Sequence, residues 1–300
     1  MSETLPQYSV EDETALPAHE RIRRVRAERW INYGRAETAL ARMAELLEYP
    51  PRDRMPCLLL FGATGMGKTK IIRKFLRDHP SDFDNRIGIT TAPVVSLQMP
   101  PDPDEKSFYE ELLGALQAPG RIGATTHQLR RVCREVLRFV GARMLIIDEV
   151  HALLAGSYRQ QRVLLNTLRF LATDLRIPLV CAGTADAKRA LTTDQQLADR
   201  FEAIELPRWH NDESFHRLPA SFQAVLPLQK RSDLVSPVMR RLLLERTDGV
   251  MVRLVRLIET MAVEAIRSGT EKIDQESLLR FAAGTPLLSM SNPPHAPAST

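Results

Sequence analysis

Short apolar runs alternate with helix-patterned segments through the first two thirds of the chain. The apolar runs, each bounded by breaker residues or helical patterns, predict strands at 57–61, 94–98, 144–148, 179–182 and 203–206. The intervening segments place apolar residues at helical spacing and predict helices at about 68–78, 107–117, 126–140, 158–174 and 194–200. Strand–helix alternation is typical of a parallel sheet covered by helices on both faces. We therefore expect an α/β fold, an αβα sandwich on a five-stranded parallel sheet.

The pattern changes after Pro207, where no further strand signal occurs. Helices are predicted there at about 212–225, 236–246, 250–267 and 274–282, and before the first strand at about 19–33 and 35–48. The expected parts are a disordered tail at 1–18, a basic helical segment at 19–50, an αβα domain at 51–208, a small all-helical domain at 209–284 and a disordered tail at 285–300.

Composition favours a globular protein of the cytoplasm. Of the 300 residues, 44% are hydrophobic and 26% charged, which excludes collagen-like, coiled-coil and fully disordered chains. No apolar run approaches the roughly 18 residues of a membrane span, and the first residues lack the apolar segment of a secretory signal, so no membrane partner is expected. The three isolated cysteines, Cys57, Cys133 and Cys181, predict reduced and mostly buried thiols.

Arginines are clustered, although the net charge is only +4. One cluster at helical spacing comprises Arg21, Arg23, Arg24, Arg26 and Arg29, and a second comprises Arg130, Arg131, Arg134 and Arg138. Each cluster fits either a solvated helix face or a surface for nucleic-acid phosphates. Both alternatives stay open for both clusters.

A glycine-rich segment directly follows the first predicted strand and precedes a predicted helix. It reads Gly62-Ala63-Thr64-Gly65-Met66-Gly67-Lys68-Thr69. This order satisfies G-x-x-x-x-G-K-[ST] in the strand–loop–helix context that a phosphate-binding loop requires. Glycines let backbone N–H groups and the helix N-terminus point at phosphate oxygens. We expect this loop, with the adjacent Lys70, to bind ATP, Lys68 to reach the β- and γ-phosphates, and the Thr69 hydroxyl to ligate Mg²⁺.

A second acidic element ends the third predicted strand, Met-Leu-Ile-Ile-Asp148, and continues with Glu149. Asp148 suits the Mg²⁺ shell, directly or through water. Glu149 suits the orientation and activation of an attacking water. The run Asp-Glu-Val-His151 also matches the D-E-x-H box of a helicase superfamily, but those enzymes need two tandem sheet domains and this chain has room for one. We therefore expect His151 to be a helix-start or surface residue.

Further positions resemble those of the AAA+ ATPases. Thr184 ends the fourth strand, where these proteins place a polar sensor near the γ-phosphate, and Arg200 precedes the fifth, where they place an arginine finger that acts on a neighbouring subunit. The rival candidates for the finger are Arg189 and Arg208. Arg253 resembles the nucleotide-contacting sensor-2 arginine of a lid domain, although it stands four residues after Gly249 and the usual spacing is three.

Flanking motifs narrow the resemblance to the TniB family, the AAA+ transposition regulators related to TnsC. They are Glu20-Arg-Ile, Arg29-Trp-Ile-Asn-Tyr33, Arg54-Met-Pro56, Arg208-Trp209 with Asn211-Asp-Glu213, and Leu226-Pro-Leu followed by Ser232 or Ser236. The resemblance covers about residues 19–283. One departure is Gly65-Met66, where the family commonly has Asn-Asn before Gly-Lys-Thr.

The resemblance implies ATP-driven assembly on duplex DNA, largely independent of base sequence, as a homo-oligomeric ring or helical filament. It also implies recruitment of a DDE transposase, often with a TniQ-type target-selecting protein. In related AAA+ initiators an insertion after the second strand faces DNA, which here implies the candidates Lys106, Arg121, Thr125 and Thr126, with Arg130 and Arg131 as a second choice. The alternatives are a helicase or clamp loader of DNA replication, and a scaffold that binds nucleotide without hydrolysing it.

Overall fold

The computed structural model describes residues 13–84, 89–118 and 123–284. They form two compact units, and the chain passes from one to the other twice. The sheet unit is Asn32–Arg208, and the helical unit combines the residues up to Ile31 with those from Trp209 onward. This division differs from the predicted basic segment at 19–50, because residues before 32 group with the C-terminal helices and residues after 31 with the sheet. The predicted tails at 1–12 and 285–300 lie outside the described residues.

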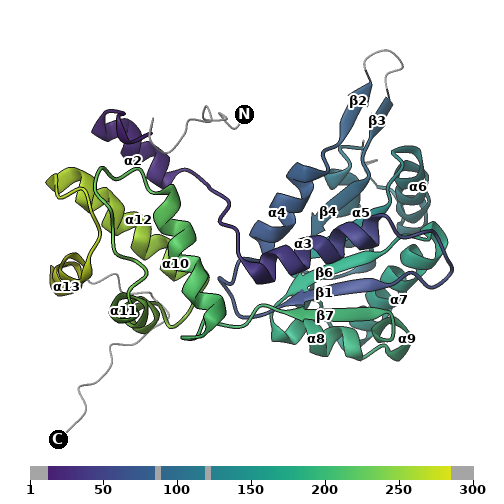
Figure 1. The fold of residues 1–300 in the computed structure, drawn as a ribbon. Coiled ribbons are helices and arrows are strands. Elements are labelled where there is room, and N and C mark those ends of the chain that lie inside the picture. The colour runs from purple at the N-terminus through teal and green to yellow at the C-terminus, as the bar shows by residue number, and fades with distance from the viewer. Residues whose placement is uncertain (1–12, 85–88, 119–122, 285–300) are drawn as a thin grey trace, which may run out of the picture. The chain divides into compact units, whose positions relative to one another are not determined.

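The sheet unit contains the expected five-stranded parallel sheet (Figure 1), in the order β4-β5-β6-β1-β7. Its strands are β1 (Cys57–Phe61), β4 (Val94–Gln98), β5 (Met144–Asp148), β6 (Leu179–Gly183) and β7 (Phe201–Glu205). Every pairing is parallel, so all five carboxyl ends lie at one edge. The strands β5 and β6 are buried along their whole length, which explains why they read as continuous apolar runs.

Helices cover both faces of this sheet, as predicted. One face packs alternate strand residues such as Leu59, Ile147 and Cys181 into a core with residues of the helices that follow β4, β5 and β6. These helices are α5 (Glu105–Ala115), α6 (Thr126–Phe139), α7 (Tyr158–Leu175), α8 (Ala185–Thr192) and α9 (Gln195–Ala198). The helices α3 (Gly34–Leu47) and α4 (Lys68–Asp78) pack against β1 and β6. Since strand side chains alternate between the two faces, residues such as Leu58 and Val180 are buried on the face covered by these two helices.

Four described elements of the sheet unit were not predicted. Strands β2 (Asp82–Asp84) and β3 (Ile89–Thr91) form an antiparallel hairpin, the 3₁₀ helix η1 (Val150–Ala155) follows β5, and α8 follows β6. The hairpin strands have three residues each and include polar ones, so no apolar run marks them. Both η1 and α8 begin within two residues of a strand end, without a separate breaker signal.

The helical unit consists of α2 (Ala18–Arg26), α10 (Glu213–Val225), α11 (Pro237–Thr247), α12 (Met251–Ser268) and α13 (Gln275–Gly284). The predicted helix at 19–33 is shorter in the structure because Ala27 adopts an extended conformation, with φ −67° and ψ 144°. Helix α2 packs against α12, whose apolar residues form the core of this unit.

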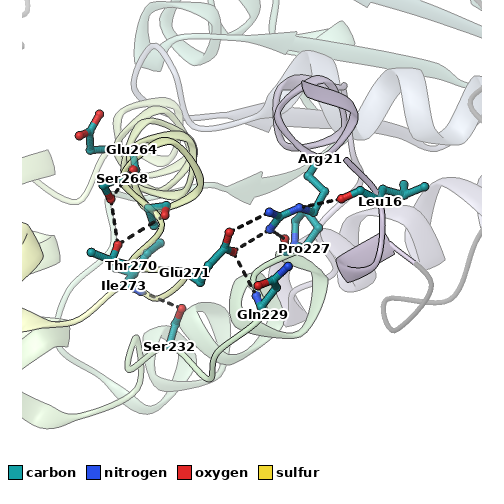
Figure 2. A network of polar contacts seen from close by, with 11 residues as sticks. Leu16, Arg21, Pro227, Gln229, Ser232, Glu264, Ser268, Thr270, Glu271 and Ile273 are labelled. Atoms are coloured by element: carbon teal, nitrogen blue, oxygen red, sulfur yellow. Dashed lines mark hydrogen bonds and ion pairs between the residues drawn. The ribbon is translucent and has the colours of Figure 1, made fainter. Parts of the chain in front are cut away.

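An ion-pair network fixes α2 in the helical unit (Figure 2). The Arg21 guanidinium donates to both carboxylate oxygens of Glu271, at 2.6 and 2.7 Å, and to the Leu16 and Pro227 carbonyls. Arg21 is 4% exposed, and the hydrogen bonds from its guanidinium lower the pKa of Glu271. Nearby, Glu13 accepts from Arg24 and Arg29. Arg21, Arg24 and Arg29 of the first cluster therefore form ion pairs within the helical unit and do not form a solvated helix face.

Among residues 13–84, 89–118 and 123–284, no helix combines the length and apolar character that crossing a membrane requires.

Candidate nucleotide-binding site

The phosphate loop connects β1 to α4, as its sequence predicts. Gly62 passes so close to Leu206 that a Cβ atom there would lie 2.3 Å from the Leu206 carbonyl oxygen. Gly67 caps α4 with a φ of 94°, a left-handed conformation that favours glycine. Met66 is buried at 3% exposure, whereas Thr64 and Lys70 are exposed, so the loop is anchored by one apolar side chain. The loop thus directs the N-terminus of an eleven-residue helix at the site.

Lys68 lies inside this loop. Its Nζ donates to the carbonyl oxygens of Gly62 and Ala63, at 2.9 and 3.0 Å, and the residue is only 6% exposed. Burial lowers the pKa of Lys68, while the nearby Glu149 and Asp148 carboxylates act in the opposite direction. A buried ammonium held by neutral carbonyls is well placed to pair with an anionic phosphate.

Thr69 and Asp148 meet across the site. The Thr69 hydroxyl donates to Asp148 Oδ2 at 2.7 Å, and the Glu149 backbone N–H donates to Asp148 Oδ1 at 2.8 Å. Asp148 is 8% exposed, so its carboxylate is held in a single environment. One hydroxyl and one carboxylate are oxygen ligands of the kind that Mg²⁺ prefers. The two residues therefore fit a magnesium site.

Glu149, His151 and Thr184 gather at the carboxyl ends of β5 and β6. Glu149 has a φ of 55°, and its Oε2 lies 3.3 Å from His151 Nε2. Thr184 stands at the start of α8, and its hydroxyl is buried without a hydrogen-bond partner among the described residues. The expectation that His151 is a helix-start residue holds in part, since it lies in the first turn of η1, but it also faces the site. Its D-E-x-H spacing was the signal that could have identified it.

Tyr33 was not predicted as a site residue. Its hydroxyl lies 3.5 Å from the position that a Cβ atom would take at Gly67, beside the phosphate loop. Burial raises the pKa of Tyr33 to about 12, so the phenol stays protonated at neutral pH. The motif Arg29-Trp-Ile-Asn-Tyr33 was the signal that could have drawn attention to it.

The arginine-finger candidates occupy different places. Arg200 lies at the amino end of the sheet, since its carbonyl accepts from the Cys57 N–H at 2.7 Å, and its guanidinium donates to Thr173 Oγ1 at 3.0 Å. Arg189 is exposed on α8 and pairs with Asp186 at 3.2 Å. Arg208 is exposed beyond the carboxyl end of β7, at the same edge as the phosphate loop.

Arg253 belongs to the helical unit and pairs there with Asp248. Asp248 and Gly249 both adopt left-handed conformations between α11 and α12. The Gly249 carbonyl accepts from the Trp209 N–H at 2.8 Å, so the turn that precedes the helix of Arg253 is fixed to Trp209.

The described DNA candidates lie on α5 or on α6 and its N-cap, and the basic ones are paired. Arg130 donates to Glu105 at 2.7 Å, Arg131 donates to Glu135 at 2.8 Å, and Lys106 lies 3.7 Å from Glu110. Thr125 caps α6 through a reciprocal contact with Gln128, and Thr126 is the first residue of that helix. Arg121 lies outside the described residues. The second arginine cluster continues this pattern, because Arg134 and Arg138 both donate to Asp174.

Comparison with known proteins identifies a family and a fold. A model of the family described as bacterial TniB protein matches residues 21–211. A search of curated proteins finds no match. Among solved structures, the ORC2 protein of Aeropyrum pernix in ADPNP–ADP complexes has a TM-score of 0.61 at 16% identity, over 89% of this chain and 73% of that one.

Two further structures are similar. The ORC1 protein of Aeropyrum pernix in complex with DNA has a TM-score of 0.58 at 18% identity, over 84% of this chain and 65% of that one. The RuvB Holliday junction branch migration motor of Thermotoga maritima has a TM-score of 0.51 at 14% identity, over 84% of this chain and 69% of that one. These likenesses confirm the predicted AAA+ P-loop fold, with its parallel sheet and helical C-terminal region.

Proposed function

Because the chain belongs to the TniB family, we propose that it is an ATP-hydrolysing AAA+ protein that assembles on duplex DNA and recruits a DDE transposase to a target site. The observation that carries the proposal is the Thr69–Asp148 contact of 2.7 Å, with Lys68 buried in the adjacent loop. It joins the two halves of a nucleotide site that lie 79 residues apart in sequence. Family membership supplies the DNA and transposase parts of the proposal.

In this proposal the chain's own residues bind and orient ATP. Backbone N–H groups of residues 62–69 and the N-terminus of α4 hold the phosphates, and Lys68 pairs with the β- and γ-phosphates. Glu149 orients and activates the attacking water, and the Thr184 hydroxyl contacts the γ-phosphate. The buried, unpartnered hydroxyl of Thr184 in the described structure supports that role, since buried polar groups ordinarily find a partner.

Thr69 and Asp148 would hold Mg²⁺, directly or through water. An ion held by these two residues would supply positive charge to offset the negative charge of the phosphate oxygens. The contact between the two ligands keeps both side chains oriented toward the same point.

The place of Arg200 supports action on a neighbouring molecule. Arg200 directly precedes β7, whereas the phosphate loop of the same chain follows the neighbouring strand β1. The backbone of Arg200 is therefore separated from that loop by the length of a five-residue strand, about 13 Å. Its guanidinium also reaches Thr173, near the end of α7 that leads back to the amino edge. We therefore assign Arg200 as the finger that a subunit supplies to the next nucleotide in a ring or helical filament. Hydrolysis then depends on assembly.

DNA contact is proposed through phosphates rather than base edges, as a sequence-tolerant filament requires. The similar ORC1 structure is a complex with DNA, which supports a nucleic-acid partner for this fold. Arg131 and Lys106 are exposed basic candidates, at 74% and 50%, and their acidic partners one helical turn away leave them accessible. A TniQ-type protein is the proposed partner for target selection, in the bacterial cytoplasm.

The test images the purified full chain by negative-stain electron microscopy with a short DNA duplex. A slowly hydrolysed ATP analogue is compared with ADP, and then transposase binding to the assembled sample is measured. We expect rings or filaments on DNA with the analogue alone, and transposase retention by those assemblies. Monomers in both nucleotides would contradict the assembly. A stable complex with a replicative helicase, without any effect on transposase, would instead favour a loader of DNA replication.

A further inference from the structure

His151 stands beside the Glu149 carboxylate but has no part in the mechanism above. It comes from η1, which begins directly after Glu149, and its Nε2 lies 3.3 Å from Glu149 Oε2. Among the residues that the structure describes, no other side chain forms an ion pair with that carboxylate. The imidazole is therefore the group that restrains it.

Glu149 needs such a restraint. Its backbone has a φ of 55°, a left-handed conformation that costs a non-glycine residue free energy, and its side chain is 39% exposed. An exposed carboxylate on a flexible side chain samples several rotamers, whereas activation of a water requires one orientation. A contact on one carboxylate oxygen reduces that freedom and leaves the other oxygen available.

Gly183 has no side chain and so leaves space for the edge of the imidazole that carries Nδ1. A Cβ atom at Gly183 would lie 3.2 Å from His151 Nδ1, 3.3 Å from the His151 backbone N and 2.8 Å from the Ala187 Cβ. His151 Nδ1 is buried and has no hydrogen-bond partner among the described residues. A ring nitrogen without an acceptor is the worse place for the proton, and Nε2 beside a carboxylate is the better one. In the tautomer that carries its proton on Nε2, the ring presents an N–H toward Glu149.

We propose that His151 is a positioning residue, whose Nε2–H holds the Glu149 carboxylate in the orientation that activates the attacking water. The inference rests on the proposed ATP hydrolysis and goes further, because it assigns a role to a side chain outside the phosphate loop and the acidic strand end. The glycine that ends β6 is compatible with this arrangement, since a Cβ atom there would crowd Ala187 and the ring.

Three substitutions at one position test the proposal. In His151→Gln the amide nitrogen takes the place of Nε2 and still reaches Glu149. In His151→Asn the amide lies at the level of Nδ1 and does not, and in His151→Ala no donor remains. ATP turnover by the full chain is measured with duplex DNA, and binding of a slowly hydrolysed ATP analogue is measured in parallel.

We expect kcat to fall on the order of 10- to 100-fold in His151→Asn and His151→Ala, with analogue binding within about twofold of wild type. We expect His151→Gln to keep most of the wild-type kcat, and His151→Ala to cause no further loss when combined with Glu149→Gln. Equal kcat in all variants, or equal losses in the Gln and Asn variants, would overturn the inference alone. A wild-type chain that binds ATP without turnover would overturn the proposed hydrolysis as well.

Discussion

The Thr69 hydroxyl donates a hydrogen bond of 2.7 Å to the Asp148 carboxylate, and this contact joins the start of α4 to the end of β5. Lys68 lies beside it with a lowered pKa, because burial disfavours its charged form. A phosphate group would reverse part of that effect, since an anion stabilises the ammonium. The site is therefore arranged to be completed by a nucleotide.

Substitution of Lys68 by alanine should abolish nucleotide binding and assembly on DNA together. Loss of a buried, charge-assisted contact predicts an affinity at least on the order of 100-fold weaker. Titration with a fluorescent ATP analogue measures this. Lys74→Ala is the matched control, because Lys74 lies on the same helix but is only partly buried and pairs with Asp78. ATP-dependent assemblies formed by the Lys68 variant would refute the phosphate-loop assignment.

Glu149→Gln should bind ATP normally and lose turnover by roughly 10²- to 10⁴-fold, the usual contribution of a general base. The amide keeps the size of the side chain but cannot accept a proton. Assemblies on DNA should therefore persist with ATP itself, and electron microscopy over time reports their lifetime. If the variant behaves as wild type, nucleotide acts as a scaffold ligand and hydrolysis has no role.

Arg200→Ala should retain nucleotide binding but lose roughly 10³-fold or more of its cooperative hydrolysis, the range measured for arginine fingers. ATP turnover as a function of protein concentration is the readout, since a residue acting in trans matters only in assemblies. Arg217→Ala is the control, as Arg217 is 83% exposed and pairs with Glu213 within its own helix. Unchanged turnover of the Arg200 variant at high protein concentration would transfer the assignment to Arg208 or Arg189.

Arg21→Ala should destabilise the helical unit by about 3–5 kcal/mol, because Glu271 would remain buried without its partner. Arg217→Ala should cost less than about 1 kcal/mol, since its pair with Glu213 is exposed. Chemical denaturation followed by circular dichroism compares the two. A loss of similar size in both variants would show that the Arg21 network contributes little.

The same network predicts a pH dependence. Arg21 lowers the pKa of Glu271 below its ordinary value of 4.5 in the folded protein. The carboxylate therefore stabilises the fold fully above about pH 4.5, and this stability is lost as the pH falls through the folded pKa. Denaturation midpoints between pH 7 and pH 3 should fall less steeply in a Glu271→Gln variant than in the wild type.

Much of the site was predictable because its chemistry depends on local spacing. The phosphate loop and the Asp148–Glu149 pair follow apolar strands, and all five strands of the sheet appear within a few residues of their predicted positions. What could not be predicted depends on long-range contacts. The spacing of Arg21 and Arg24 indicated a basic helix face, but only the partners Glu271 and Glu13 show that these arginines are buried. The place of His151 likewise follows from Gly183, on the adjacent strand.

The separation of Arg21 from Glu271 has a consequence for synthesis on the ribosome. The two residues are 250 positions apart. At a synthesis rate of 5–20 residues per second, Glu271 is therefore added roughly 10 to 50 s after Arg21. Helix α2 is synthesised before the other described helices of its unit, and those helices follow only after the whole sheet unit has been synthesised. A fragment that begins at Trp209 would never receive α2, and its Glu271 would be left as an unpaired carboxylate.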